Sequence, residues 1–264
     1  MLNLNQLKLG FIGFGNMGSA IAYGLIDYDV LKGNQIYACA KNWDKLCRNT
    51  KAKGINACKD AAEVAANADM IILAVKPYMI EAVSAPIKDI LQHKIVISIA
   101  ANFPFDAYEK ILLPNTHHLS TIPNTPIAVG EGIFICENKH SLTDEEITLF
   151  KQLFAKIAIV EFVETHQLSV GGTIAGCGPA FASMFIEALG DAGVKHGLTR
   201  AAAYRLASQM LVGTGKLQLA TGTHPAAMKD AVCSPGGTTV VGVAALERKG
   251  FRSAVIEAID DIEK

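Results

Sequence analysis

The sequence contains no continuous hydrophobic run long enough to span a bilayer. Its richest apolar runs, 70–75 and 95–101, are far shorter than the roughly 18 residues that a membrane-spanning helix needs. The first residues, 1–6, lack the basic start and the apolar core of a signal peptide. We therefore expect a cytoplasmic protein with no membrane partner.

An excess of one charge and the spacing of a metal site are also missing. The chain has 24 Lys and Arg against 25 Asp and Glu, a formal net charge of -1, so it offers no basic patch for nucleic acid and we expect no such partner. Its six cysteines form no Cys-x-x-Cys pair and fit no zinc spacing. The adjacent His117 and His118 would point to opposite faces of a strand. We expect no metal, and we interpret the cysteines as reduced thiols of a cytosolic protein.

The first part of the chain alternates between strand and helix patterns. Half of its 264 residues are hydrophobic, which is enough for one large or two ordinary domains. Apolar runs predict strands at 7–13, 35–39, 70–75, 95–100 and 158–163, and helical patterns lie at 16–26, 43–53 and from Thr143 to about 156. This alternation predicts an α/β Rossmann domain with a doubly wound, mostly parallel sheet at residues 1–162.

From about residue 165 onward no convincing strand pattern is found. Helices are predicted at 179–189 with Pro179 in the first turn, from a Thr199 cap to about 219, from 225, at 238–249 and at 252–262. Small residues are frequent here, and they let helices pack closely. We expect residues 163–264 to form an all-α domain whose apolar content suits burial against a second copy of the chain.

The stretch 13–18 (Gly13, Phe14, Gly15, Asn16, Met17, Gly18) has the Gly-x-Gly-x-x-Gly pattern between a predicted strand and a predicted helix. The first glycine allows a tight turn, the second lets a pyrophosphate approach the backbone, and the third lets the helix pack on the strand. Phosphates would then lie at a helix N-terminus, where free N–H groups and the helix dipole favour anions. A glycine-rich turn without a ligand is the alternative. The position in the first strand–helix unit of an alternating series favours a dinucleotide site.

The end of the second predicted strand favours NADPH. An enzyme that uses NAD usually has an acidic residue there to hold the ribose 2′-OH. This chain reads Ala-Cys-Ala-Lys-Asn at 38–42, with no acid before Asp44. Because Lys41 could pair with a 2′-phosphate, we expect NADPH as the cofactor, with NADH as the alternative.

Two loops follow predicted strands near the carboxyl edge, where open α/β sheets bind ligands. The first contains Ala74, Val75, Lys76 and Pro77, and a solvated Lys76 is as good an interpretation as a ligand contact. The second is the proline-stiffened loop 122–126. Its Asn124 could hydrogen-bond the cofactor or only brace its own turn.

The stretch 234–239 (Ser234, Pro235, Gly236, Gly237, Thr238, Thr239) precedes a predicted helix. Two glycines followed by two hydroxyl residues would present backbone N–H groups and hydroxyls to an anion such as a carboxylate. An ordinary helix start, with Thr238 as the N-cap, explains the pattern equally well.

Motifs along nearly the whole chain resemble those of pyrroline-5-carboxylate reductases. They are His-Pro-Ala-Ala-Met-Lys-Asp at 224–230, Ser-Pro-Gly-Gly-Thr-Thr at 234–239, Gly-Pro-Ala-Phe at 178–181, Ala-Val-Lys-Pro at 74–77 and Pro-Asn-Thr-Pro at 123–126. The resemblance implies a Rossmann domain followed by an all-α dimerisation domain that interleaves with its partner's. It also implies NAD(P)H-dependent reduction of 1-pyrroline-5-carboxylate, a cyclic imino acid, to L-proline, the last step of proline biosynthesis.

The resemblance also implies roles for individual residues. Ile12 to Met17 and 74–77 would contact the cofactor, and Ser234 with Gly236 to Thr239 would hold the substrate carboxylate. The Thr239 hydroxyl would be the proton donor beside the imine nitrogen. The assembly implied is a homodimer or a set of dimers. Ser120 and Ser169 depart from the family pattern, which usually has Arg and Asp there. These departures bear on how the loops are braced more than on the binding site itself.

Two other functions stay open. The β-hydroxyacid dehydrogenases share the plan of a Rossmann domain followed by helices, but they place a lysine on a long central helix as acid/base. The stretch 179–189 has no lysine, and Lys195 follows only later. The second alternative is a non-catalytic regulatory module that binds NADPH and a partner protein. In such a module the stretch 234–239 would only begin a helix and would bind no substrate.

Overall fold

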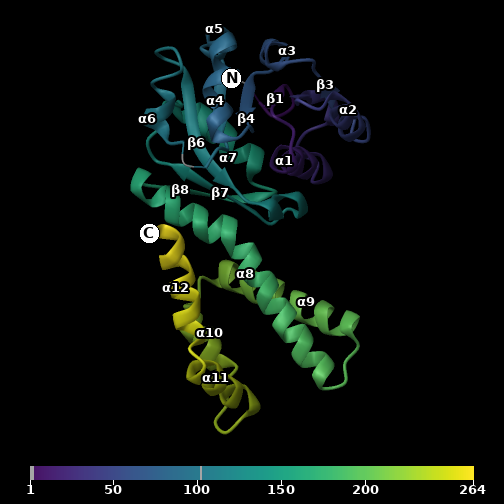
Figure 1. Ribbon diagram of the computed structural model, residues 1–264, viewed down its shortest axis with the longest axis vertical. Helices are drawn as coiled ribbons and strands as arrows, with labels where there is room; N and C mark the ends of the chain where they lie inside the picture. Colours follow the sequence, from purple (N-terminus) through teal and green to yellow (C-terminus); the bar gives the residue numbers. More distant parts are fainter. Residues whose placement is uncertain (1–2, 102) are drawn as a thin grey trace. The chain divides into compact units, whose positions relative to one another are not determined.

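The computed structural model describes residues 3–101 and 103–264 (Figure 1). Met1 and Leu2, which belong to the N-terminal segment considered above, lie outside the described residues. The chain divides into two compact units, Met1–Gly176 (unit 1) and Cys177–Lys264 (unit 2). The expected boundary at 162/163 stays a prediction.

Unit 1 is built on an eight-stranded sheet with the order β3-β2-β1-β4-β5-β6-β7-β8. Its strands are β1 (Leu9–Ile12), β2 (Ile36–Cys39), β3 (Asn56–Ala57), β4 (Met70–Leu73), β5 (Ile95–Ser98), β6 (His117–Pro123), β7 (Gly132–Glu137) and β8 (Ala158–Val163). All neighbours pair in parallel except β6 and β7, which are antiparallel. This mostly parallel, doubly wound sheet confirms the predicted fold class.

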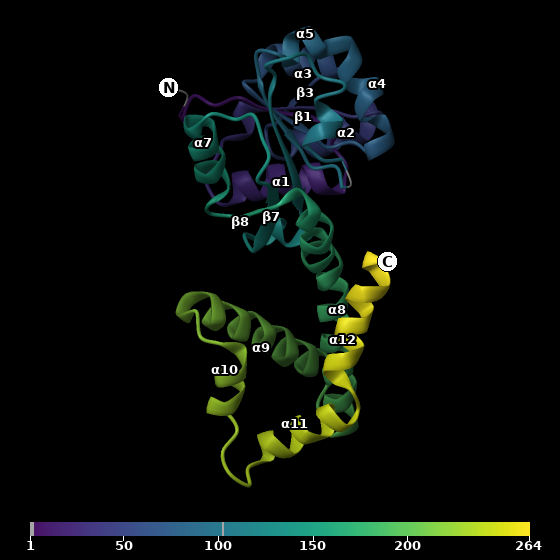
Figure 2. The same ribbon diagram turned by 90° about the vertical axis from the view of Figure 1, so that its left-hand side faces the viewer.

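Helices cover both faces of the sheet (Figure 2). They are α1 (Asn16–Asp27), α2 (Trp43–Lys51), α3 (Ala61–Asn67), α4 (Ile80–Ser84), α5 (Lys88–Leu91), α6 (Phe105–Tyr108) and α7 (Asp144–Phe154). One core contains side chains from α1 and α7, and the other contains side chains from α3, α4 and α5. Met70 and Ile72 of β4 belong to the first core and Ile71 and Leu73 to the second, which is why this strand is apolar throughout.

Local capping sets where several helices begin. Asn42 accepts the Lys45 N–H at 2.9 Å before α2, and Asp60 accepts the Glu63 N–H at 2.9 Å before α3. Thr143 and Glu146 form a reciprocal capping box at the start of α7.

The antiparallel strand β7 was not predicted, and 122–126 was interpreted as a loop although β6 extends through Pro123. The pattern of β6 is polar, yet His118, Ser120 and Thr121 are buried. Hydrogen bonds explain this, because Thr121 Oγ1 donates to the Ser98 carbonyl at 2.7 Å and Ser120 Oγ to the Phe103 carbonyl at 3.1 Å.

The helices of the second half are α8 (Leu168–Lys195), α9 (Arg200–Thr221), α10 (Pro225–Ala231), α11 (Thr238–Arg248) and α12 (Phe251–Glu263). The prediction that Pro179 begins a helix is wrong, because Pro179 lies inside α8. Among the described residues, Thr165–Lys195 is also long and apolar enough to cross a membrane by length and composition. The search for continuous apolar runs missed it, since small and hydroxyl residues interrupt the pattern.

Candidate functional site

The glycine loop follows β1 and begins α1. Gly13 has a φ of +98°, and a Cβ there would lie 2.5 Å from the Ala74 carbonyl oxygen. A Cβ on Gly18 would lie 2.8 Å from the Gly13 carbonyl oxygen. The turn and the helix–strand contact therefore require glycine at both positions.

Gly15, the middle glycine of the pattern, is different. A Cβ on Gly15 would meet nothing within 4 Å, and the Gly15 φ of -84° is one that any residue can adopt. The fold itself therefore does not require glycine at this position. Gly15 is also the N-cap of α1, and no side chain caps the helix. The first-turn N–H groups of α1 thus have no intrahelical acceptor, and the space beside Gly15 is open. This is the arrangement that a bound pyrophosphate requires, so the loop fits a dinucleotide.

The loops after β1, β2 and β4 leave the sheet at one edge. In the strand register Ile12 lies level with Cys39 on one side and with Leu73 on the other. Lys41 and Lys76 follow these strands, and both side chains are exposed. In the described part of the chain neither amine has a hydrogen-bonded or ionic partner, so both are available to an anion at this edge.

Asn124 lies at the end of β6, with its side chain only 4 % exposed. Its Nδ2 donates to the Ala175 carbonyl at 3.0 Å, and its Oδ1 accepts the Ile133 N–H at 2.9 Å. Of the two roles considered for Asn124, this geometry favours bracing. A contact with the cofactor stays a prediction.

A cavity of about 150 Å³, with a mainly apolar lining, lies at the carboxyl ends of β5 and β6, and sequence reasoning missed it. Ser120 and Ser169, which both depart from the family pattern, line it. Nearby, the buried Tyr108 hydroxyl donates to Ser98 Oγ. Burial raises the Tyr108 pKa, and the Ser98 hydrogen bond opposes this rise only in part, so Tyr108 remains a neutral phenol.

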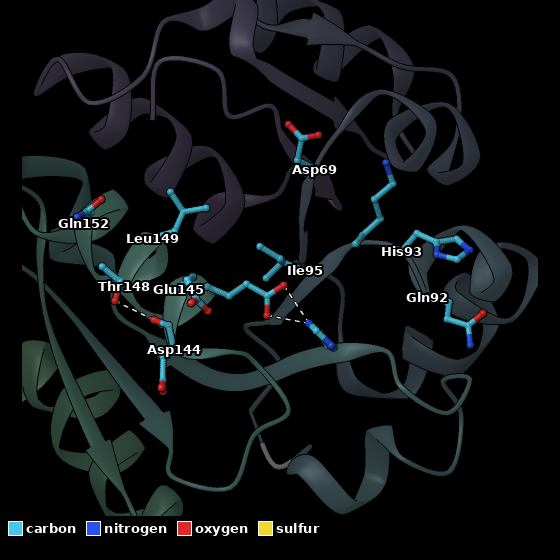
Figure 3. A pocket seen from close by; sticks show the side chains of 12 residues that line it. Asp69, Gln92, His93, Ile95, Asp144, Glu145, Thr148, Leu149 and Gln152 are labelled. Atoms are coloured by element: carbon cyan, nitrogen blue, oxygen red, sulfur yellow. Dashed lines mark hydrogen bonds and ion pairs between the residues drawn. The ribbon is translucent and has the colours of Figure 1, made fainter. Parts of the chain in front are cut away.

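A larger cavity, of about 700 Å³, lies at the opposite edge of the sheet (Figure 3). Ile95 and His117 line it from the first positions of β5 and β6, and His117 Nδ1 lies 2.8 Å from Glu146 Oε2. In Figure 3, Asp144 and Glu145 lie on one side of the cavity and His93 on the other. Because the glycine loop, Lys41 and Lys76 all lie at the carboxyl edge, the larger cavity is not the dinucleotide site.

In unit 2, the stretch 234–239 forms a turn before α11. Gly236 has a φ of +68°, and the Gly237 N–H donates to the Ser234 carbonyl at 3.0 Å. A Cβ on Gly237 would lie 2.5 Å from Ser234 Oγ. The N-cap of α11 is Gly237 rather than Thr238, and no side chain caps the helix. The alternative of an ordinary Thr238 cap is therefore wrong, and the first N–H groups of α11 are open to a ligand.

The hydroxyls of Thr238 and Thr239 are exposed. Within the residues that the structure describes, neither has a hydrogen-bond partner. Together with Ser234 they give this stretch three hydroxyl side chains next to helix N–H groups that no side chain caps, a combination suited to an anionic ligand.

Burial makes two of the cysteine thiols harder to ionise. All six are free, and burial raises the pKa of Cys58 to about 11 and also raises that of Cys136. Among the described residues, no group of three or more His, Cys, Asp and Glu side chains could hold a metal ion.

Comparison with known proteins places this geometry in a family. The chain is 45% identical over 257 residues to the pyrroline-5-carboxylate reductase of Treponema pallidum (strain Nichols), covering 96% of this chain and 97% of that protein. The chain belongs to the pyrroline-5-carboxylate reductase family. The enzyme of that name from Escherichia coli (strain K12) is 40% identical over 255 residues, covering 96% of this chain and 95% of the relative.

Solved structures agree with this family. A pyrroline carboxylate reductase of Plasmodium falciparum with NADP bound has a TM-score of 0.86 at 30% identity, covering 98% of this chain and 97% of that one. A pyrroline-5-carboxylate reductase of Coxiella burnetii has a TM-score of 0.87 at 30% identity, covering 98% of this chain and 96% of that one. Residues 165–264 match the family model for pyrroline-5-carboxylate reductase dimerisation, and residues 8–102 match that for NADP oxidoreductase coenzyme F420-dependent.

Proposed function

We propose that this protein reduces 1-pyrroline-5-carboxylate to L-proline with NADPH as the hydride donor. The observation that carries the proposal is the uncapped turn at 234–239, which offers helix N–H groups and three hydroxyls to a carboxylate. It occurs in a chain that aligns over 96% of its length with pyrroline-5-carboxylate reductases. The β-hydroxyacid dehydrogenase and regulatory-module alternatives lack such support.

The nicotinamide supplies the hydride when the cofactor is bound. The N–H groups after Gly15 hold the pyrophosphate, and Lys41 pairs with the 2′-phosphate. Because a threonine hydroxyl has no pKa near 7, Thr239 does not act as a strong acid. Its hydroxyl orients or relays a proton to the imine nitrogen. Ser234 and the α11 N–H groups hold the substrate carboxylate. They thereby position the imine carbon to receive the hydride, and most of the rate acceleration comes from this positioning.

We also propose that the helical half forms a homo-oligomer, either a dimer or an assembly of dimers. In unit 2 the buried hydrophobic side chains are only Ala203 and Ala207, while many large apolar residues are exposed, among them Met184, Leu206, Leu219 and Ile256. Apolar exposure on this scale indicates a protein–protein surface. The match of 165–264 to a dimerisation family supports a second copy as the partner.

The same argument applies to the apolar stretch Thr165–Lys195, in which 11% of the most hydrophobic 18-residue window is buried. It carries Pro179, Glu187 and Asp191, and carboxylates are costly in lipid. We propose that a second chain covers it rather than a membrane, and that the protein is cytoplasmic, as its six free thiols suggest.

A steady-state assay of NADPH oxidation tests the function. The purified chain is offered 1-pyrroline-5-carboxylate, a β-keto acid or neither substrate. We expect oxidation with the cyclic imine alone and L-proline as the product. Turnover with the β-keto acid would support the dehydrogenase alternative, and NADPH binding without turnover would support the regulatory module.

A further inference from the structure

Cys39 and Cys58 lie side by side at the ends of two neighbouring strands. The parallel register of β2 and β3 pairs Ala38 with Ala57. Cys39 and Cys58 are the next residues along these strands and therefore lie opposite each other. The Cys58 N–H donates to the Ala38 carbonyl at 2.8 Å, which continues the ladder beyond the last residue of β3. Because paired strands are about 4.8 Å apart, the Cα separation suits a disulfide, which needs about 4.4–6.8 Å.

Both thiols also belong to the same core. Ala38 and Ala57 pack in the core that contains side chains from α1 and α7, on one face of the sheet. Cys39 and Cys58 are buried in the core on the other face, with 7% and 3% of their surfaces exposed. Burial raises the pKa of Cys58 to about 11, and the charges of Glu63 and Cys39 add to this rise. The two side chains thus point to one side of the sheet and are close enough for the charge of one to act on the other.

The backbone of Cys39 is bonded to the glycine loop. The Gly13 N–H donates to the Cys39 carbonyl at 3.1 Å. On its other side Gly13 lies against the end of β4, because a Cβ on Gly13 would be 2.5 Å from the Ala74 carbonyl oxygen. Gly13 is therefore held between the ends of β2 and β4 with little room to move. A displacement of Cys39 toward β3 would be passed to the turn that begins the dinucleotide site.

We propose that Cys39 and Cys58 form a disulfide when the protein meets a peroxide, and that this bond weakens the binding of NADPH. The effect on binding rests on the proposed use of NADPH. In the structure described here both thiols are free. Linking them pulls the end of β2 toward β3, so the Gly13 N–H either loses its bond to the Cys39 carbonyl or moves with it. Either displacement shifts the N–H groups after Gly15 that would hold the pyrophosphate.

The reaction balances with hydrogen peroxide as the oxidant. The Cys39 thiolate attacks one peroxide oxygen, the O–O bond breaks, and hydroxide leaves while Cys39 becomes a sulfenic acid. The Cys58 thiolate then attacks the Cys39 sulfur, the S–O bond breaks, and a second hydroxide leaves. The two thiol protons convert both hydroxides to water, so the thiols lose two electrons and the peroxide gains them. Because burial raises the pKa of Cys39 as well, the thiolate is scarce at pH 7 and the reaction should quicken as the pH rises.

Peptide mapping detects the bond directly. The full-length protein is treated with hydrogen peroxide, separated from it by gel filtration, alkylated and digested without reductant. We expect a linked pair of peptides that contain Cys39 and Cys58, and the loss of this pair after dithiothreitol. Calorimetry on the undigested samples should give a Kd for NADPH raised roughly 10-fold by oxidation, within the range for coupled sites, and restored by dithiothreitol. Absence of the linked pair, or a linked protein that binds NADPH as the reduced one does, would overturn the proposal.

Variants show whether this pair of thiols is responsible. Cys58→Ala should bind NADPH as the wild type does and should keep that Kd after peroxide. Cys136→Ala removes a buried thiol from the other core and should lose affinity after peroxide as the wild type does. Circular dichroism checks that each variant folds. Loss of affinity in peroxide-treated Cys58→Ala would also refute the proposal, because another oxidation would then be its cause.

The imine-reduction assay on the reduced protein keeps this proposal separate from the proposed function. A disulfide that weakens NADPH binding in a protein without turnover would reject only the function. Turnover by a protein that forms no disulfide between Cys39 and Cys58 would reject only the present inference.

Discussion

Asn124 donates to the carbonyl of Ala175, the acceptor that Pro179 leaves free within α8. In a regular helix the N–H of residue 179 would bond to the carbonyl of residue 175, but proline has no N–H. The Asn124 Nδ2 takes this place at 3.0 Å, and its Oδ1 accepts the Ile133 N–H. One buried amide thus joins β7 to α8 and makes a proline tolerable in the middle of that helix.

Asn124→Ala should therefore lower stability rather than cofactor affinity. Two backbone groups would lose their partners, at about 1–3 kcal/mol each, which urea unfolding measures. Asn138→Ala removes an exposed amide and serves as the control. Adding Pro179→Ala to Asn124→Ala should recover about 1 kcal/mol, because the Ala175 carbonyl regains a donor. A weaker Kd for NADPH at unchanged stability would instead make Asn124 a cofactor contact.

The three glycines of the loop should respond differently to alanine. Gly15→Ala fills space that the protein leaves open, so we expect the Kd for NADPH to rise 10-fold or more with unfolding free energy within about 0.5 kcal/mol of wild type. Gly18→Ala collides with the Gly13 carbonyl and should lower stability by about 1–3 kcal/mol. Calorimetry and thermal unfolding separate the two effects. Equal stability loss in both variants would contradict the distinction.

The glycine loop and the first strands were predictable because their signals are local. The apolar runs of β4 and β5 reflect burial on both faces, and the Thr143–Glu146 box is complete within four residues. The resemblance then supplied a substrate for the stretch 234–239, which the pattern alone left open.

The errors arose where long-range contacts override local preference. Proline favours the first turn of a helix because it has no N–H to donate. Asn124, 55 positions before Pro179 in the chain, donates to the Ala175 carbonyl instead, so Pro179 can lie inside α8. Strand β6 is too polar to be recognised as a buried strand, because its hydroxyls find partners on Ser98 and Phe103.

His118 should make stability depend on pH. Burial lowers its pKa below the ordinary 6.5, against the opposing hydrogen bond and charge of Glu109 and the charge of Glu137, while the His117 charge adds to the lowering. Between pH 6.5 and the lower pKa of His118 in the folded protein, the unfolded chain therefore binds more protons than the folded one. The stability that neutral His118 contributes is complete above pH 6.5 and is lost as the pH falls through this window.

Thermal unfolding from pH 7 to 5 measures this contribution. His118→Gln should flatten the decline in Tm relative to the wild type. His117→Gln changes the neighbouring, more exposed histidine and should keep the part of the slope that His118 supplies. Parallel curves for the wild type and His118→Gln would show that His118 is not responsible.

Lys41→Glu should weaken the preference for NADPH over NADH. A carboxylate at the end of β2 repels a 2′-phosphate and can accept a hydrogen bond from a ribose 2′-OH. We expect the ratio of kcat/KM for NADPH over NADH to fall by about 10-fold or more, which corresponds to about 1.4 kcal/mol. Lys8→Glu makes the same charge change before β1, at the other edge of the sheet, and should leave the ratio nearly constant. An unchanged ratio in Lys41→Glu would remove Lys41 from the site.

Thr239 and Ser234 should affect different kinetic constants. If the Thr239 hydroxyl relays the proton, Thr239→Ala should lower kcat by about 10- to 100-fold, the lower part of the range for a positioned proton donor. Thr239→Ser keeps a hydroxyl and should retain most of kcat. If Ser234 holds the substrate carboxylate equally in the ground and transition states, Ser234→Ala should mainly raise KM. Steady-state kinetics with varied 1-pyrroline-5-carboxylate distinguishes these outcomes. An unchanged kcat in Thr239→Ala would leave the proton to water, and the turn at 234–239 would then act by binding alone.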